Sequence, residues 1–193
     1  MKIVFASQNQ HKIDEIAALV DDSIQISGLD EYNLKEEIPE TGSTLIENAL
    51  QKARFVAGRF GVNCFADDTG LEVSALNGAP GVYSARYAGE QKNAEANMKK
   101  LLLELEGKAD RSARFKTVIA LLFDGKEYLF EGVMNGTILT ERRGSGGFGY
   151  DSLFVPEGSS LTFAEMSALE KNKCSHRAKA VEKLITFLNE INA

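Results

Sequence analysis

The sequence predicts an α/β fold in which a largely mixed β-sheet is flanked by helices. Apolar runs typical of strands are interspersed with segments whose apolar residues recur at helical spacing. Two strand-like runs are separated by Asp124-Gly125, a hairpin signal, so the strands are not all parallel. Hydrophobic residues make up 44% and charged residues 26% of the 193 residues, which is typical of one globular domain with a substantial core.

The first strand is expected at residues 2–6, a short apolar run that meets polar residues too soon for a secretion signal. A helix should follow, because Ile13, Ile16, Ala17 and Val20 recur at helical spacing.

A second helix is expected over residues 44–59, since Thr44 and Glu47 have the spacing of a capping box. Residues 62–66 then resemble a short buried strand that ends at the acidic pair Asp67-Asp68.

The second half of the chain supplies the remaining elements. A third helix is expected at about residues 94–105, and two strand-like runs follow at 113–123 and 127–135. Another short strand is expected at residues 153–155. The last helix, about 176–190, follows a Ser175 cap and places its apolar residues on one stripe.

Composition also excludes several classes of protein. The net charge of −6 argues against binding to long nucleic acid, which needs a broad basic surface. No apolar run approaches the roughly 20 residues of a membrane helix. Cys64 and Cys174 stand far apart without a Cys/His cluster, so neither a disulfide framework nor a zinc site is expected. A cytoplasmic location fits this cysteine usage.

The junction at residues 7–12 can hold a phosphate. A helix N-terminus exposes unpaired N–H groups and partial positive charge, to which Lys12 adds a full charge. Ser7 and Asn9 add polar side chains. The spacing is not that of a Walker loop. Taken alone, a capped helix with a solvated lysine explains the segment better.

Three further motifs have a chemical and a structural interpretation. Adjacent carboxylates at Asp67-Asp68 suit a hard divalent cation and a water to be activated, or else an Asx-type turn. The glycine-rich residues 144–151 contain Phe148 and Tyr150, on which a base can stack, or else form a flexible loop. The basic residues 170–177 suit phosphate or a carbonyl oxygen, or else a solvated charge run.

Taken together, the motifs resemble those of the inosine triphosphate pyrophosphatases, also called XTP/dITP diphosphatases. The resemblance spans nearly the whole chain. Ser7 stands where many members have Thr, and Met166 where some have Leu. The matching segments are Ser7-x-Asn9-x-x-Lys12, Glu40-Thr41-Gly42, Glu47-Asn48-Ala49, Lys52-Ala53, residues 66–71, 78–87, 146–151 and 163–166, Glu170-Lys171 and Ser175-His176-Arg177.

The resemblance implies a long mixed central sheet with two lobes around a substrate cleft, in a single domain over residues 1–193. It implies a homodimer that hydrolyses ITP, dITP and XTP to the monophosphate and pyrophosphate with Mg²⁺. An enzyme of similar fold acting on modified pyrimidine or ordinary triphosphates is an alternative. A nucleotide-sensing module without hydrolysis is another.

The resemblance also implies a role for individual residues. Glu40 and Asp68 would bind Mg²⁺, Asp68 would be the base that activates water, and Asp67 would support them. Phe148 would stack on the purine base, and Lys12 would be the main cation for the phosphates. The full set of expected substrate-binding residues is Ser7, Gln8, Asn9, Gln10, His11, Lys12, Thr69, Phe148, Gly149, Tyr150, Asp151, Lys171, His176 and Arg177.

Overall fold

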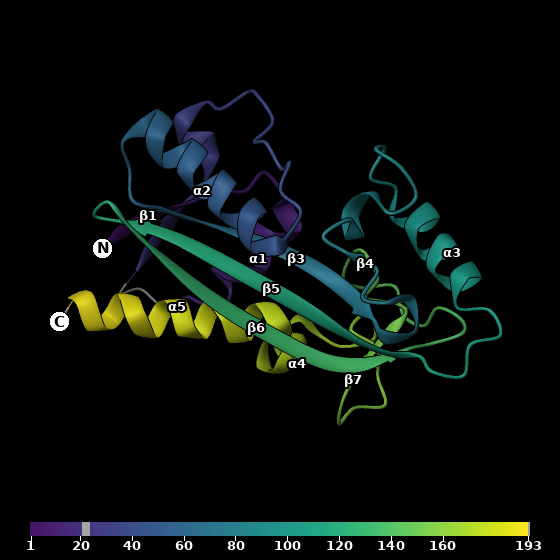
Figure 1. Cartoon of the computed structure of the whole chain (residues 1–193). Helices are drawn as coiled ribbons and strands as arrows, with labels where there is room; N and C mark the ends of the chain where they lie inside the picture. Colours follow the sequence, from purple (N-terminus) through teal and green to yellow (C-terminus); the bar gives the residue numbers. More distant parts are fainter. Residues whose placement is uncertain (21–23, 193) are drawn as a thin grey trace. The chain divides into compact units, whose positions relative to one another are not determined.

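The computed structural model describes residues 1–20 and 24–192, in which strands and helices are mixed along the chain (Figure 1). The predicted domain range 1–193 includes residues that lie outside the described part. The strands are β1 (Lys2–Phe5), β2 (Gln25–Ser27), β3 (Cys64–Val73), β4 (Pro80–Gly81), β5 (Ser112–Phe123), β6 (Lys126–Ile138) and β7 (Phe154–Pro156). The α-helices are α1 (Gln10–Ala17), α2 (Leu45–Phe60), α3 (Ala94–Glu104), α4 (Ala168–Cys174) and α5 (His176–Asn192).

The strands form one mixed sheet, as the sequence predicts. Their order is β2-β1-β3-β5-β6-β7, and β4 pairs with β3. β1 is parallel to both β2 and β3, whereas the β3–β4 and β6–β7 pairs are antiparallel. The predicted α/β class with a mixed central sheet flanked by helices is therefore confirmed.

The chain divides into two compact units. Unit 1 contains Met1–Asp68, Thr117–Gly132 and Arg177–Ala193, and unit 2 contains Thr69–Lys116 and Val133–His176. Each unit has its own apolar core. The single catalytic domain and the two lobes around a cleft stay predictions.

The core of unit 1 is built on the strands β1, β3 and β5. Phe5 and Phe65 stack with their ring centroids 4.8 Å apart, and Val181 and Leu184 of α5 belong to the same buried cluster. The buried residues of α2 include Ala49, Ala53 and Val56. Figure 1 shows α2 and α5 on opposite sides of the strands. The sheet in unit 1 is thus covered on both faces.

Local sequence signals explain the bounds of several elements. Thr44 and Glu47 form the predicted capping box of α2, which ends at Gly61 in the left-handed conformation with φ 64°. The Asp124-Gly125 turn has positive φ at both residues, 49° and 75°, as a tight hairpin between β5 and β6 requires. The predicted helices near 94–105 and 176–190 correspond to α3 and α5.

The strand predicted at 62–66 is longer than expected. The prediction that it ends at the acidic pair is wrong, because β3 continues through Asp67 and Asp68 to Val73. An Asx-type turn at this pair is excluded for the same reason. Buried carboxylates are tolerated within a strand when cations reach them. Here those cations come from residues distant in the sequence.

The basic segment at 170–177 does not form the start of a single helix. Ser175, with φ −65° and ψ 155°, is extended and separates α4 from α5. α4 begins with a second capping box, in which Ser167 and Glu170 exchange hydrogen bonds. Lys171 therefore belongs to α4, and His176 and Arg177 open α5.

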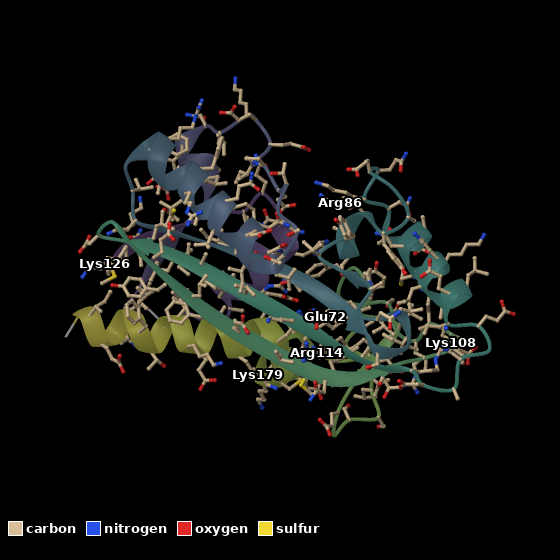
Figure 2. The ribbon with its side chains drawn as sticks, in the orientation of Figure 1. Glu72, Arg86, Lys108, Arg114, Lys126 and Lys179 are labelled. Carbon is tan, nitrogen blue, oxygen red and sulfur yellow. The ribbon has the colours of Figure 1, made fainter. Side chains whose placement is uncertain are left out.

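Unit 2 carries an exposed ion pair on its sheet. Arg114 of β5 and Glu72 of β3 lie side by side, with 2.6 Å between Nε and Oε2 (Figure 2). Within residues 1–20 and 24–192, no helix has the length and apolar character needed to cross a bilayer.

Candidate active site

Asp67 lies at the centre of a buried group of charges in unit 1. Its Oδ1 accepts a hydrogen bond from Lys12 Nζ at 2.9 Å, and its Oδ2 lies 3.3 Å from both Nε and Nη2 of Arg177. Burial alone would raise the pKa of Asp67, but the charges of Lys12 and Arg177 outweigh burial and hold that pKa well below its ordinary value. Asp67 is therefore an ionised anchor for two cations.

Asp68 faces a different set of partners, although it is the next residue. Lys52 Nζ lies 3.8 Å from Asp68 Oδ1 and donates a hydrogen bond to Glu40. Asn48 Nδ2 donates to Asp68 Oδ2 at 3.1 Å. Burial raises the pKa of Asp68 above its ordinary value, despite the opposing charge of Lys52. Of the acidic pair, Asp68 is thus the better proton acceptor near neutral pH.

Arg177 completes this group from the first turn of α5. It is only 2% exposed, and its Nη1 donates to Glu15 of α1. We call the following residues the carboxylate cluster: the acids Glu15, Glu40, Asp67 and Asp68 with the cations Lys12, Lys52 and Arg177.

The donor set of the carboxylate cluster suits magnesium. Glu40 and Asp68 offer hard carboxylate oxygens and both contact Lys52. Throughout the described part of the chain, no group of three or more His, Cys, Asp or Glu side chains could hold a metal ion. Mg²⁺ is usually bound through one or two carboxylates together with substrate phosphates and water. The two carboxylates therefore fit the predicted metal, whose presence stays a prediction.

The predicted phosphate loop contributes one side chain to the carboxylate cluster, that of Lys12. Asn9 caps α1, since its Oδ1 accepts from the Lys12 amide at 3.3 Å, and its own amide donates to Ser7 Oγ at 3.2 Å. Gln8, Gln10 and His11 are exposed. Gln8 donates to the carbonyl of Glu36, and Gln10 to Asp14.

The predicted base loop is organised by Asp151 in unit 2. Asp151 Oδ2 accepts hydrogen bonds from the Phe148 amide at 2.9 Å and from Lys171 Nζ at 2.7 Å. Lys171 Nζ also lies 5.1 Å from the centroid of the Phe148 ring. Gly147 has φ 67°, and a Cβ there would come within 2.1 Å of Asp151 Oδ2. Phe148, Asp151 and Lys171 are thus brought together, and their role in binding a base stays a prediction.

The remaining predicted residues lie deeper or apart. Tyr150 is 4% exposed and belongs to the apolar core of unit 2, and its hydroxyl donates to the carbonyl of Ser84. The His176 ring stacks on Phe115 with centroids 4.6 Å apart. Thr69 is half-buried on β3, and Gly149 has φ 61°.

Sequence reasoning missed four residues that hold these groups: Glu15, Asn48, Lys52 and Ser84. Asn48, Lys52 and Ser84 belong to matching segments but received no role. The position of Lys52 on the buried stripe of α2, four residues after Asn48, is the signal that could have found it.

Known proteins with similar sequences carry the name that the motifs suggest. A family model described as the Ham1 family matches residues 3–187. A dITP/XTP pyrophosphatase of Porphyromonas gingivalis is 56% identical over 188 residues, which cover 97% of each chain. A dITP/XTP pyrophosphatase of Flavobacterium johnsoniae is 54% identical over 188 residues, or 97% of this chain and 98% of that protein.

Solved structures give the same result. The structure of a HAM1 protein from Coxiella burnetii is similar with a TM-score of 0.91 and 43% identity, covering 98% of this chain and 99% of that one. The resemblance seen in the sequence motifs is confirmed, and the chain belongs to the Ham1 family.

Proposed function

We propose that this protein is a dITP/XTP pyrophosphatase that hydrolyses non-standard purine nucleoside triphosphates, ITP included, to the monophosphate and pyrophosphate. The observation that carries the proposal is the placement of Asp68, a buried carboxylate that accepts a hydrogen bond from Asn48 and lies beside Lys52, which also contacts Glu40. Relatives more than half identical over nearly the whole chain bear that enzyme's name. Removal of such nucleotides from the pool would be its role.

In this mechanism Asp68 is the general base. Its Oδ2 is held by Asn48, so Oδ1 is the atom that would take a proton from water. The oxygen of that water forms a bond to the α-phosphorus, and the bond from this phosphorus to the α,β-bridging oxygen breaks. The electron pair leaves with pyrophosphate.

Glu40 and Asp68 would hold Mg²⁺, which would neutralise charge on the phosphate oxygens and on the departing pyrophosphate. Lys12 would hold the phosphate chain from the N-terminus of α1. Burial lowers the pKa of Lys12, so its ammonium gains from an additional anionic partner. Asp67 would keep Lys12 in place, since it accepts that ammonium at 2.9 Å.

Selectivity would come from the purine base. Phe148 would stack on the ring, with Lys171 and Asp151 fixing the loop that carries it.

A donor from His176 would meet the 6-oxo group of hypoxanthine or xanthine, whereas adenine has a 6-amino donor at that position. An unpaired buried donor costs about 1–3 kcal/mol, so this contact discriminates roughly tenfold. Arg177, which is already held by Asp67 and Glu15, would support the site from α5.

A substrate panel assayed for pyrophosphate release tests the function. We expect turnover of ITP, dITP and XTP to exceed that of ATP and of modified pyrimidine triphosphates, and to stop when EDTA removes the metal. Preference for pyrimidine or ordinary triphosphates would support the alternative enzyme. Absence of pyrophosphate in a single turnover with ITP and Mg²⁺ would support a nucleotide sensor instead.

Replacing Phe148 by alanine tests the stacking role. We expect KM for ITP to rise about tenfold, because stacking of a base on an aromatic ring contributes about 1–3 kcal/mol. The kcat should change less. Phe148→Tyr keeps the ring and should keep KM near the wild-type value. Equal KM values for the alanine variant and the wild type would show that Phe148 does not stack on the base.

We also propose that the protein is a cytoplasmic homodimer, in keeping with the family resemblance and with the cysteine usage. Light scattering on the eluting peak of a sizing column should give twice the chain mass of 21.1 kDa.

A further inference from the structure

Ser84 joins three motifs of unit 2 through its polar atoms. Its Oγ accepts a hydrogen bond from the Leu71 amide at 2.8 Å and donates one to the Gly81 carbonyl at 2.6 Å. Its carbonyl oxygen accepts a hydrogen bond from Tyr150 Oη at 2.7 Å. Ser84 is only 7% exposed, so water competes little for these bonds.

Two of these partners belong to segments already assigned to the reaction. Leu71 is the third residue after Asp68 on β3, and a strand advances about 3.3 Å per residue. Tyr150 is the second residue after Phe148 and precedes Asp151 in the base loop. Ser84 therefore joins the strand of the proposed base to the loop of the proposed purine site.

The turn that carries Ser84 is itself held from several sides. Asn97 of α3 donates to the Ala85 carbonyl at 2.8 Å and accepts from the Ala88 amide at 2.7 Å. Lys100 donates to the Tyr87 carbonyl at 2.8 Å. These bonds hold the backbone that follows Ser84, so its carbonyl and hydroxyl keep fixed positions, and Tyr150 and Leu71 are anchored to the same rigid turn.

We propose that Ser84 is a positioning residue that couples the base loop to the catalytic strand. The coupling rests on the proposed pyrophosphatase function. A purine stacked on Phe148 fixes Tyr150, Tyr150 fixes the Ser84 carbonyl, and the Ser84 hydroxyl fixes the Leu71 amide. Binding of the correct purine base therefore changes kcat as well as KM.

The test is a double-mutant cycle on kcat and KM for ITP. Ser84→Ala removes the bonds to Leu71 and Gly81, and Tyr150→Phe removes only the bond to the Ser84 carbonyl. We expect each to lower kcat about tenfold to a hundredfold, because misplacement by about 1 Å has effects of that size, with a smaller change in KM. The double variant should be no slower than the slower single variant.

Matched controls separate positioning from general loss of structure. Ser112→Ala and Tyr128→Phe each remove one hydroxyl, from an exposed serine and from a tyrosine that packs on Phe187. Both should keep wild-type kcat. Ser84→Thr retains the hydroxyl and should recover most of the activity. Amide exchange at Leu71 should speed up in Ser84→Ala, since the acceptor of its hydrogen bond is gone.

The outcomes are distinct. Effects of the two substitutions that multiply in the double variant, or wild-type kcat in Tyr150→Phe, would overturn the coupling. Tyr150→Phe keeps the buried ring, so it decides the question even if Ser84→Ala does not fold. Failure of the wild-type protein to release pyrophosphate from ITP would contradict the proposed function itself.

Discussion

Replacing Asp68 by asparagine should lower kcat for ITP hydrolysis by about a hundredfold to ten-thousandfold, the range for loss of a general base. The amide oxygen of asparagine can still accept the hydrogen bond from Asn48, but it cannot take the proton of the attacking water. The fold should survive. Burial disfavours the charge of Asp68, and Lys52 keeps its partner Glu40, so the midpoint of urea unfolding should not fall.

The control for this variant is Asp124→Asn. Asp124 lies in the β5–β6 turn with φ 49°, a conformation that asparagine adopts readily. Its kcat should equal that of wild type. A kcat for Asp68→Asn within a few-fold of the wild-type value would show that Asp68 is not the general base.

Replacing Arg177 by alanine should lower the free energy of unfolding by about 3–5 kcal/mol, as expected when one partner of a buried ion pair is removed. The guanidinium is 2% exposed and contacts both Asp67 and Glu15. Without it, Glu15 loses that partner and Asp67 retains Lys12. Urea titration followed by circular dichroism measures the change.

Arg114→Ala is the matched control for Arg177→Ala. The Arg114–Glu72 pair is exposed, so its loss should cost about 1 kcal/mol or less. Arg177→Lys keeps the charge but cannot reproduce the two-sided contact, and should fall between wild type and Arg177→Ala. Equal losses of unfolding free energy in Arg177→Ala and Arg114→Ala would show that the buried ion pair stabilises the fold no more than the exposed pair does.

Elements with local signals were predictable from the sequence. The capping box at Thr44 and the positive-φ turn at Asp124-Gly125 act through neighbouring residues, so the α2 start and the β5–β6 hairpin followed from short patterns. The end of β3 was not predictable in this way. Two adjacent aspartates favour a turn locally, and they remain in a strand because Lys12, Lys52 and Arg177 compensate their charge.

The site was predictable in its types of residue more than in its contacts. The resemblance named Asp68, Glu40 and Lys12, which the structure places in one charged group in unit 1, while their roles stay predictions. It gave no role to Lys52 or Ser84, whose importance depends on partners 12 to 66 positions away. The position of Lys52 on the buried stripe of α2 is visible in the sequence, but its two carboxylate partners are not, nor are the strand and the loop that Ser84 joins.

The carboxylate cluster has a consequence for what competes with the substrate in the cell. Its acids outnumber its cations by one, because Glu15, Glu40, Asp67 and Asp68 face Lys12, Lys52 and Arg177. Each cation already contacts a carboxylate, so an anion that approaches Lys12 without a metal ion also meets the surplus negative charge of the cluster. Only a ligand that brings its own positive charge, such as a bound metal ion, neutralises this surplus. Abundant cellular anions should therefore be poor inhibitors of this protein.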